Sequence, residues 1–191
     1  MYQVRFYQGD YEERQQRANQ DGCVAYIEQH FNSSDNPATA HTEVLVAGNA
    51  SERSRAWGRD YAQAVAAAFG CPLGGRERDG LMVLHDGDRG VGNIERTAMP
   101  AILVEPLFVS NPEQAALIRS EEGQELLAQC LVQSVRAHFP QGGLIGFSVG
   151  HKYKTSAPRD RGAPLAGPGG GEEADYAERV LLRARDLLVS G

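Results

Sequence analysis

Two histidines and one glutamate occupy positions in this sequence where side chains could carry out chemistry. His30 follows the apolar run CVAYIEQ, and His151 follows the apolar run LIGFSVG. Both are expected at the carboxyl ends of central strands, the edge of an open α/β sheet where ligands bind. Glu105 interrupts the run AILV-E-PLFV, where a buried carboxylate is costly unless a metal, a bound water or a cation compensates for its desolvation. A further histidine, His85, ends the run LMVL and could face the same crevice.

Two more carboxylates, Glu172 and Glu173, begin a helical pattern directly after the segment Gly-Pro-Gly-Gly-Gly. Carboxylates favour helix N-termini for dipole reasons alone, and lone histidines are often structural. Taken together, however, two imidazoles and one carboxylate make a catalytic zinc set that leaves the fourth position for water. A second glutamate that does not bind the metal would then serve as the general base. These residue types favour metal-assisted hydrolysis.

Composition places the chain among ordinary globular proteins. It has 191 residues, of which 41% are hydrophobic and 23% are charged, values that suit one domain with a substantial core. The net charge of −6 argues against nucleic acid or an anionic membrane as partner, since both select basic surfaces. No apolar run approaches the roughly 20 residues of a membrane helix. The charged N-terminal stretch is unlike a secretory signal, which leaves the location of the protein open.

Strand and helix patterns alternate along the chain. Strands are expected around residues 4–6 and over 23–31, 43–48, 81–85, 101–109 and 144–149. Helices are expected over 11–20, 51–69, 110–118, 122–138 and 172–188, and residues 152–171 form a loop rich in Pro and Gly. This order predicts a single α/β domain over residues 1–191, with a twisted, mostly parallel sheet flanked by helices.

Two stretches resemble the zinc-dependent N-acetylmuramoyl-L-alanine amidase family. PAILVEPLFVSNPEQAALI is similar to the late signature of that family, which implies that Glu105 is the catalytic carboxylate. VRFYQGDYEERQQRANQDGCVAYIEQHFN resembles a second block through Arg17, Ala18, Asn19, His30 and Asn32, which implies that His30 binds zinc. The family pattern has Ser-Ile before this histidine. Here Glu28 and Gln29 stand instead, a departure expected to alter the rim of the site.

The opening block of the family, a strand followed by Gly-His, a loop and a helix that begins with glutamate, stands at the end of this chain. The resemblance therefore implies a circularly permuted order, in which residues 144–191 are the family's N-terminal part and residues 1–140 its middle and C-terminal part. It implies His151 as a zinc ligand and favours Glu173 over Glu172 as another. Lys152 and Tyr153 occupy positions where the family has glycines.

The resemblance implies one Zn²⁺ held by His30, His151 and Glu173, with Glu105 as general base. The expected reaction is hydrolysis of the amide bond between N-acetylmuramic acid and L-alanine, with peptidoglycan or a muropeptide as substrate. Polar residues near Asn32 and within 152–171 are the candidates for substrate contact. Two alternatives stay open: a related zinc peptidase or amidohydrolase acting on another amide, and a degenerate amidase domain that binds cell-wall fragments.

Overall fold

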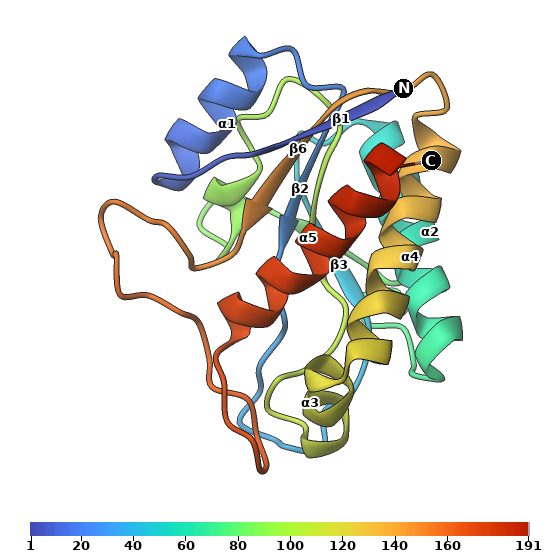
Figure 1. Ribbon diagram of the computed structural model, residues 1–191, viewed down its shortest axis with the longest axis vertical. Coiled ribbons are helices and arrows are strands. Elements are labelled where there is room, and N and C mark those ends of the chain that lie inside the picture. The colour runs from blue at the N-terminus through green and yellow to red at the C-terminus, as the bar shows by residue number, and fades with distance from the viewer. Residues whose placement is uncertain (191) are drawn as a thin grey trace.

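The computed structural model describes residues 1–190 and contains one six-stranded sheet with helices on both faces (Figure 1). The order of strands across the sheet is β1-β6-β2-β5-β3-β4. Strands β1 to β6 span Tyr2–Phe6, Ala25–Gln29, Glu43–Ala47, Leu81–Leu84, Ala101–Glu105 and Gly143–Val149. Helices α1 to α5 span Tyr11–Gln20, Glu52–Phe69, Pro112–Arg119, Glu121–His138 and Glu173–Ser190, and a short 3-10 helix, η1, spans Val91–Asn93. The predicted single-domain α/β architecture is confirmed.

Local signals explain where the helices begin and end. The side chain of Ser51 accepts a hydrogen bond from the backbone N–H of Ser54 at the start of α2, which satisfies one of the free donors of the first turn. Gly70 ends the same helix in the left-handed region, at φ 63°, where glycine carries little steric cost. The predicted helix over 51–69 therefore matches α2 to within one residue.

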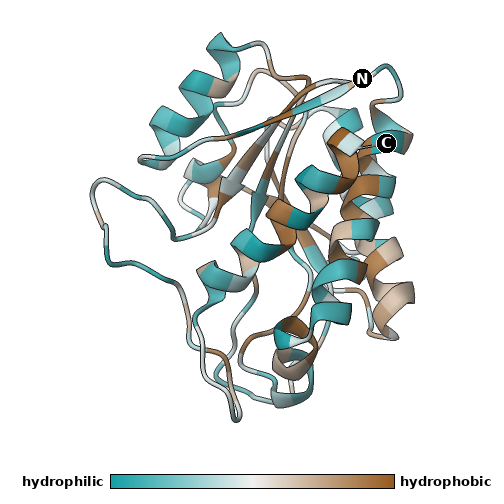
Figure 2. Cartoon of the chain, in the orientation of Figure 1, coloured by the Kyte–Doolittle hydropathy of each residue, from teal (hydrophilic) through white to brown (hydrophobic). Residues whose placement is uncertain are grey.

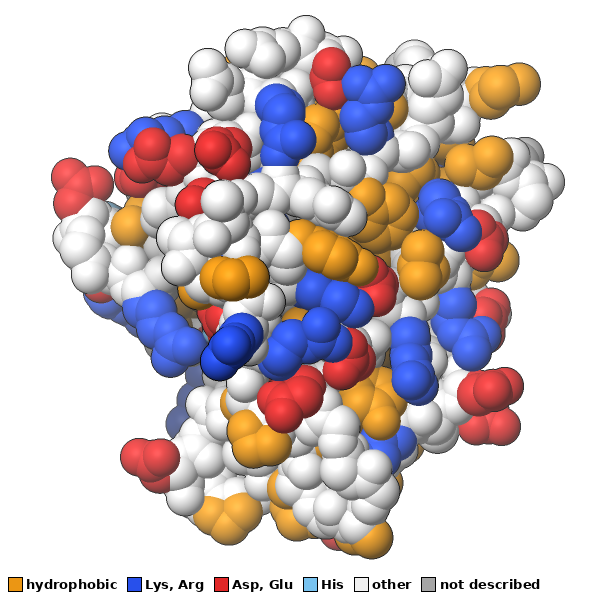
Figure 3. Space-filling view, turned by 60° about the vertical axis from the view of Figure 1, so that its left-hand side comes forward, with side chains coloured by type: hydrophobic (Ala, Val, Ile, Leu, Met, Phe, Trp, Pro, Cys, Tyr) orange, Lys and Arg blue, Asp and Glu red, His pale blue; other side chains and the backbone are white. Residues whose placement is uncertain are grey.

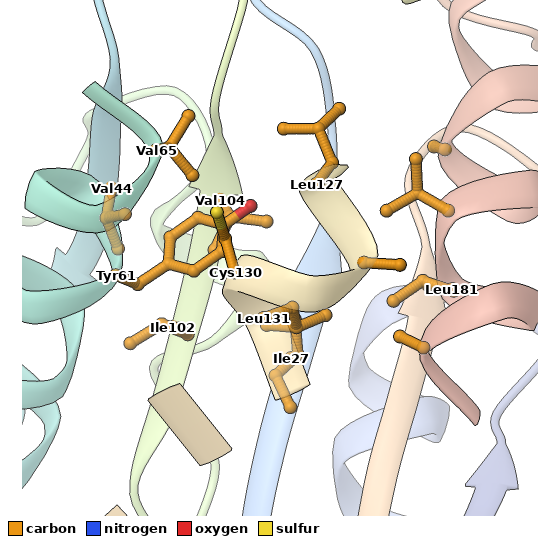
Figure 4. Close-up of a cluster of buried hydrophobic side chains, with 14 of the residues drawn as sticks. Ile27, Val44, Tyr61, Val65, Ile102, Val104, Leu127, Cys130, Leu131 and Leu181 are labelled. Carbon is orange, nitrogen blue, oxygen red and sulfur yellow. The ribbon is translucent and has the colours of Figure 1, made fainter. Parts of the chain in front are cut away.

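The helices form one layer on each face of the sheet. Helices α2, α4 and α5 pack on one face, and α1 lies on the other together with the segment that contains η1 (Figure 1). Figure 4 shows the core on the first face, where Tyr61 and Val65 of α2 and Leu131 of α4 surround Ile102 and Val104 of β5. This core fixes the strands whose ends carry the candidate site.

Helices α1 and α4 differ in what they bury. Figure 2 shows α1 as almost entirely hydrophilic, whereas α4 carries apolar bands between hydrophilic ones and packs between α2 and α5. The residues that α1 buries are Arg14, Gln15 and Ala18. Two of these three are polar, so α1 contributes a hydrogen-bonding network to the sheet rather than a second large apolar core.

The sheet is mostly parallel, as predicted, but β3 and β4 run opposite to the other four strands. Strand β3 pairs antiparallel with β5, so that Glu43 lies opposite Glu105, and β4 pairs parallel with β3. The carboxyl ends of β3 and β4 consequently lie at the other edge of the sheet from those of β2, β5 and β6. The idea that His85 faces the candidate crevice is therefore wrong, since it follows β4 and lines a separate pocket beside Ala47.

Two predicted strands are shorter in the structure. The run expected over 101–109 ends as a strand at Glu105, because Pro106 has no backbone N–H to donate to a neighbouring strand. The run expected over 23–31 forms β2 only over Ala25–Gln29. Both strands thus stop at or just before a candidate site residue, which leaves His30 and Glu105 at the sheet edge.

Segments from the beginning and the end of the chain lie together. Strand β1 pairs in parallel with β6, with Tyr2 opposite Gly143, and the N–H of Gly143 donates to the carbonyl of Met1. Gly142 has φ 75°, and a Cβ there would overlap the backbone of Met1. Helix α5 packs against both β1 and β6, and β6 lies between β1 and β2 in the sheet, so the last strand and the last helix are integral parts of the fold.

The surface carries both signs of charge. On the face shown in Figure 3, Lys and Arg side chains lie beside Asp and Glu side chains. Ion pairs such as Lys152–Glu178 and Arg161–Asp175 connect the loop before α5 to that helix.

Among residues 1–190, no helix has the combination of length and apolar character needed to cross a membrane.

Candidate metal centre

A cavity of about 640 Å³ opens at the carboxyl ends of β2, β5 and β6. Its lining includes the four residues singled out from the sequence, His30, Glu105, His151 and Glu173. The loop before α5 contributes Lys154 and Asp160 to the lining, and the start of β3 contributes Glu43. The crevice expected from the strand pattern is therefore present.

Three of these side chains converge. Nδ1 of His30 lies 3.0 Å from Oε1 of Glu173, and Nε2 of His151 lies 3.5 Å from the same oxygen. One ligand atom from each residue lies within 4.8 Å of the others. Glu173 is 3% exposed, whereas Glu172 is half-buried and stands outside the cluster. The structure thus brings Glu173, and not Glu172, to the histidines.

Two glycines allow this close approach. A Cβ on Gly150 would overlap the imidazole of His30, and a Cβ on Gly162 would overlap the carboxylate of Glu173. His151 itself has φ 61°, a left-handed conformation that is uncommon outside glycine and concentrates at functional sites. The backbone N–H groups of Phe31 and Ala163 donate to Glu173. Local backbone geometry therefore holds the cluster in place.

Each histidine is bound at its other nitrogen by a second carboxylate. Nε2 of His30 lies 2.8 Å from Oε1 of Glu28, and Nδ1 of His151 lies 3.0 Å from Oδ1 of Asp160. These contacts leave Nδ1 of His30 and Nε2 of His151 directed at Glu173. A carboxylate on the outer nitrogen is the usual support for a metal-binding histidine, since it fixes the ring and its tautomer.

The charges in the cluster are strongly coupled. Burial alone would lower the pKa of His30, but hydrogen bonds to Glu173 and Glu28 raise the pKa to about 10. Burial opposes ionisation of Glu173, yet the two imidazoles lower its pKa below the usual value. A cation at this position is therefore favoured, and in the metal-free protein the imidazolium of His30 provides it.

Glu105 lies in the same cavity but has different charged neighbours. Burial raises its pKa to about 7, and the carboxylates of Glu43 and Glu173 add to this effect against the positive charges of His30 and Arg89. Glu43 is ionised more readily, because His41 and Asn32 beside it lower its pKa despite burial. A carboxyl group with a pKa near neutrality can both accept and release a proton at physiological pH.

The donor set fits a divalent metal such as zinc. Two imidazole nitrogens and one carboxylate oxygen are common zinc ligands, and bonds of about 2.0–2.1 Å in a tetrahedron place neighbouring ligand atoms about 3.3 Å apart. The separations of 3.0 and 3.5 Å around Glu173 bracket that value. The predicted trio thus offers donor types and a spacing that suit one ion, and all three residues line the cavity.

Sequence reasoning missed three carboxylates at this site. Glu28 was expected at the rim, but it is fully buried beneath His30, because residues two apart in a strand share one face. Period-2 alternation from His30 back to Glu28 was the available signal. Asp160 lies in a loop without periodicity, and Glu43 reaches the site only because β3 runs antiparallel.

Comparison with known proteins shows which family the sequence belongs to. The profile of the N-acetylmuramoyl-L-alanine amidase family matches residues 3–137, more than half of the chain. The chain belongs to this amidase family. The match includes His30 and Glu105 and ends before His151 and Glu173. Among curated proteins, none matches the sequence.

Solved amidase structures share this fold at low sequence identity. The catalytic domain of the amidase CwlV from Bacillus (Paenibacillus) polymyxa var. colistinus is 22% identical, with a TM-score of 0.55 over 69% of this chain and 66% of that one. The amidase from Clostridium difficile 630 is 21% identical, with a TM-score of 0.58 over 70% of this chain and 67% of that one. The amidase Ami1 from Mycobacterium smegmatis is 22% identical, with a TM-score of 0.59 over 69% of this chain and 61% of that one. The chain therefore matches about two thirds or less of the length of these structures.

The raised pKa of His30 leads to the first prediction. We expect the imidazole of His30 to stay doubly protonated in the metal-free protein at about pH 8, where an imidazole of ordinary pKa, about 6.5, is mostly neutral. Nitrogen-15 NMR of the histidine side chains measures this directly. Because a metal competes with the proton on Nδ1, apparent zinc affinity should rise with pH over the same range. A neutral imidazole of His30 at that pH would contradict the raised pKa of this side chain.

Proposed function

We propose that the protein is a zinc-dependent amidase that hydrolyses the amide bond between N-acetylmuramic acid and L-alanine in peptidoglycan or muropeptides. The observation that carries the proposal is the convergence of His30, His151 and Glu173 beside Glu105 in one cavity. Membership of the amidase family supports the same reaction. A single Zn²⁺ held by the trio would polarise the scissile carbonyl and activate water at neutral pH.

The residues of this chain would then have separate roles in the reaction. Glu105 accepts the proton of the attacking water and passes it to the leaving amine of the peptide, a transfer for which a pKa near 7 is well matched. Asp160 holds the imidazole of His151. Asn32, whose amide donates to Glu43, and Lys154 line the cavity where the sugar and peptide groups would lie.

We also propose that the order of segments in this chain is circularly permuted relative to the family. In this interpretation residues 144–191 supply the family's opening strand and helix, and residues 1–140 supply the rest. The family match over residues 3–137 supports this, as does the position of β6 between β1 and β2. The contact of α5 with β1 is what the family order, helix followed by strand, would require.

Glu105 provides the sharpest test of the reaction. We expect Glu105→Gln to lower kcat on purified muropeptides by about 100-fold to 10,000-fold, the usual contribution of a general base, while the zinc content per chain stays that of the unmodified protein. Product analysis by mass spectrometry and metal analysis measure the two quantities. Retained activity would reassign the base. Muropeptide binding without hydrolysis by the unmodified, zinc-loaded protein would instead support a cell-wall-binding domain.

The permutation has a structural test. A superposition that disregards the order of segments is expected to place β6, His151 and Glu173 on an equivalent strand, histidine and glutamate in the solved amidases. If these elements of the amidases have no counterpart in residues 144–190, the segments are related differently and the permutation is wrong.

A further inference from the structure

Glu28 is a fully buried carboxylate whose role the proposed reaction does not define. It lies on β2 two residues before His30, so both side chains project from the same face of the strand. Its Oε1 atom is 2.8 Å from Nε2 of His30. A carboxylate is costly to bury unless hydrogen bonds or charges satisfy its oxygens, so the contacts around Glu28 show what holds it there.

Both oxygens of Glu28 have partners. The amide of Asn93 donates to Oε1 at 2.7 Å, and the hydroxyl of Ser148 donates to Oε2 at 2.9 Å. These partners come from η1, which packs against α1, and from β6, the neighbour of β2 in the sheet. The carboxylate is therefore fixed by donors that are independent of His30.

The network continues to Arg14 of α1, which is also fully buried. Its guanidinium donates to the hydroxyl of Ser148 at 2.7 Å and to the carbonyl of Val149 at 2.8 Å. It also donates to the carbonyls of Gly9 and Lys152. The hydroxyl of Ser148 thus accepts from Arg14 and donates to Glu28, so its orientation is set at both ends.

We propose that Glu28 is the positioning residue of the metal centre and that Arg14, Ser148 and Asn93 hold it in place. Because Glu28 can only accept at Nε2, that nitrogen carries the proton and Nδ1 presents its lone pair to the metal. Asp160 does the same for His151 through the opposite nitrogen. The two rings are thereby locked in complementary tautomers around Glu173. This inference rests on the proposed zinc site.

The experiment compares zinc affinity in Glu28→Gln and Glu43→Gln by competition with a chelator. Both substitutions remove one negative charge near the cavity, but Glu43 contacts neither histidine ligand nor Glu173 in the part of the chain that the structure describes. We expect Glu28→Gln to weaken zinc binding by about 10-fold to 100-fold, the range typical of lost outer-shell support, and Glu43→Gln to change it by less than about threefold. Equal effects of the two variants, or none from Glu28→Gln, would overturn the proposal.

Nitrogen-15 NMR of the zinc-loaded, unmodified protein supplies a second measurement that does not depend on the folding of a variant. We expect the proton of His30 on Nε2 and zinc on Nδ1. The reverse arrangement would overturn the positioning role while leaving the zinc site intact. If the unmodified protein binds no zinc, the proposed function itself fails, and this inference fails with it.

Discussion

The carboxylate of Glu173 lies buried between the imidazoles of His30 and His151, and much of the structure follows from the need to satisfy it. A buried carboxylate stays ionised only where positive charge or hydrogen-bond donors surround it. Here two histidines and two backbone N–H groups do so. The same three side chains, without the proton on His30, form a group that could hold a metal ion. Glu173 and the two histidines therefore determine both the charge balance around the buried carboxylate and the chemistry proposed for the site.

This requirement explains the architecture around the cavity. The histidines come from the ends of β2 and β6, neighbours in the sheet although about 120 residues separate them in the sequence. Glu173 comes from the start of α5, which packs on β6 and β1. Glycines at 150 and 162 permit the backbone to approach His30 and Glu173. A site of this kind needs segments from both parts of the chain, which is why the order of the segments bears on its completeness.

The sequence contained enough information to find the trio but not its support. Apolar runs ending in histidine predict the position of His30 and His151, because strand ends are a matter of local pattern. Helix bounds such as those of α2 follow from its capping residues. The direction of β3 depends on which strand it pairs with, and a local sequence pattern does not determine that pairing. The prediction for His85 was therefore wrong, and the position of Glu43 in the cavity could not be predicted. The role of Asp160 depends on a loop conformation without a repeating pattern. For Glu28, the period-2 alternation with His30 indicates a position on the same face of the strand, whereas the departure from the family's Ser-Ile by itself indicates only a change at the rim.

We propose that one zinc ion binds among His30, His151 and Glu173. Crystallographic anomalous scattering at the zinc edge is the measurement that locates such an ion. We expect a single strong peak, about 2.0–2.2 Å from Nδ1 of His30, Nε2 of His151 and a carboxylate oxygen of Glu173. A zinc-soaked crystal with no peak in this cavity, or with its peak on other ligands, would contradict it.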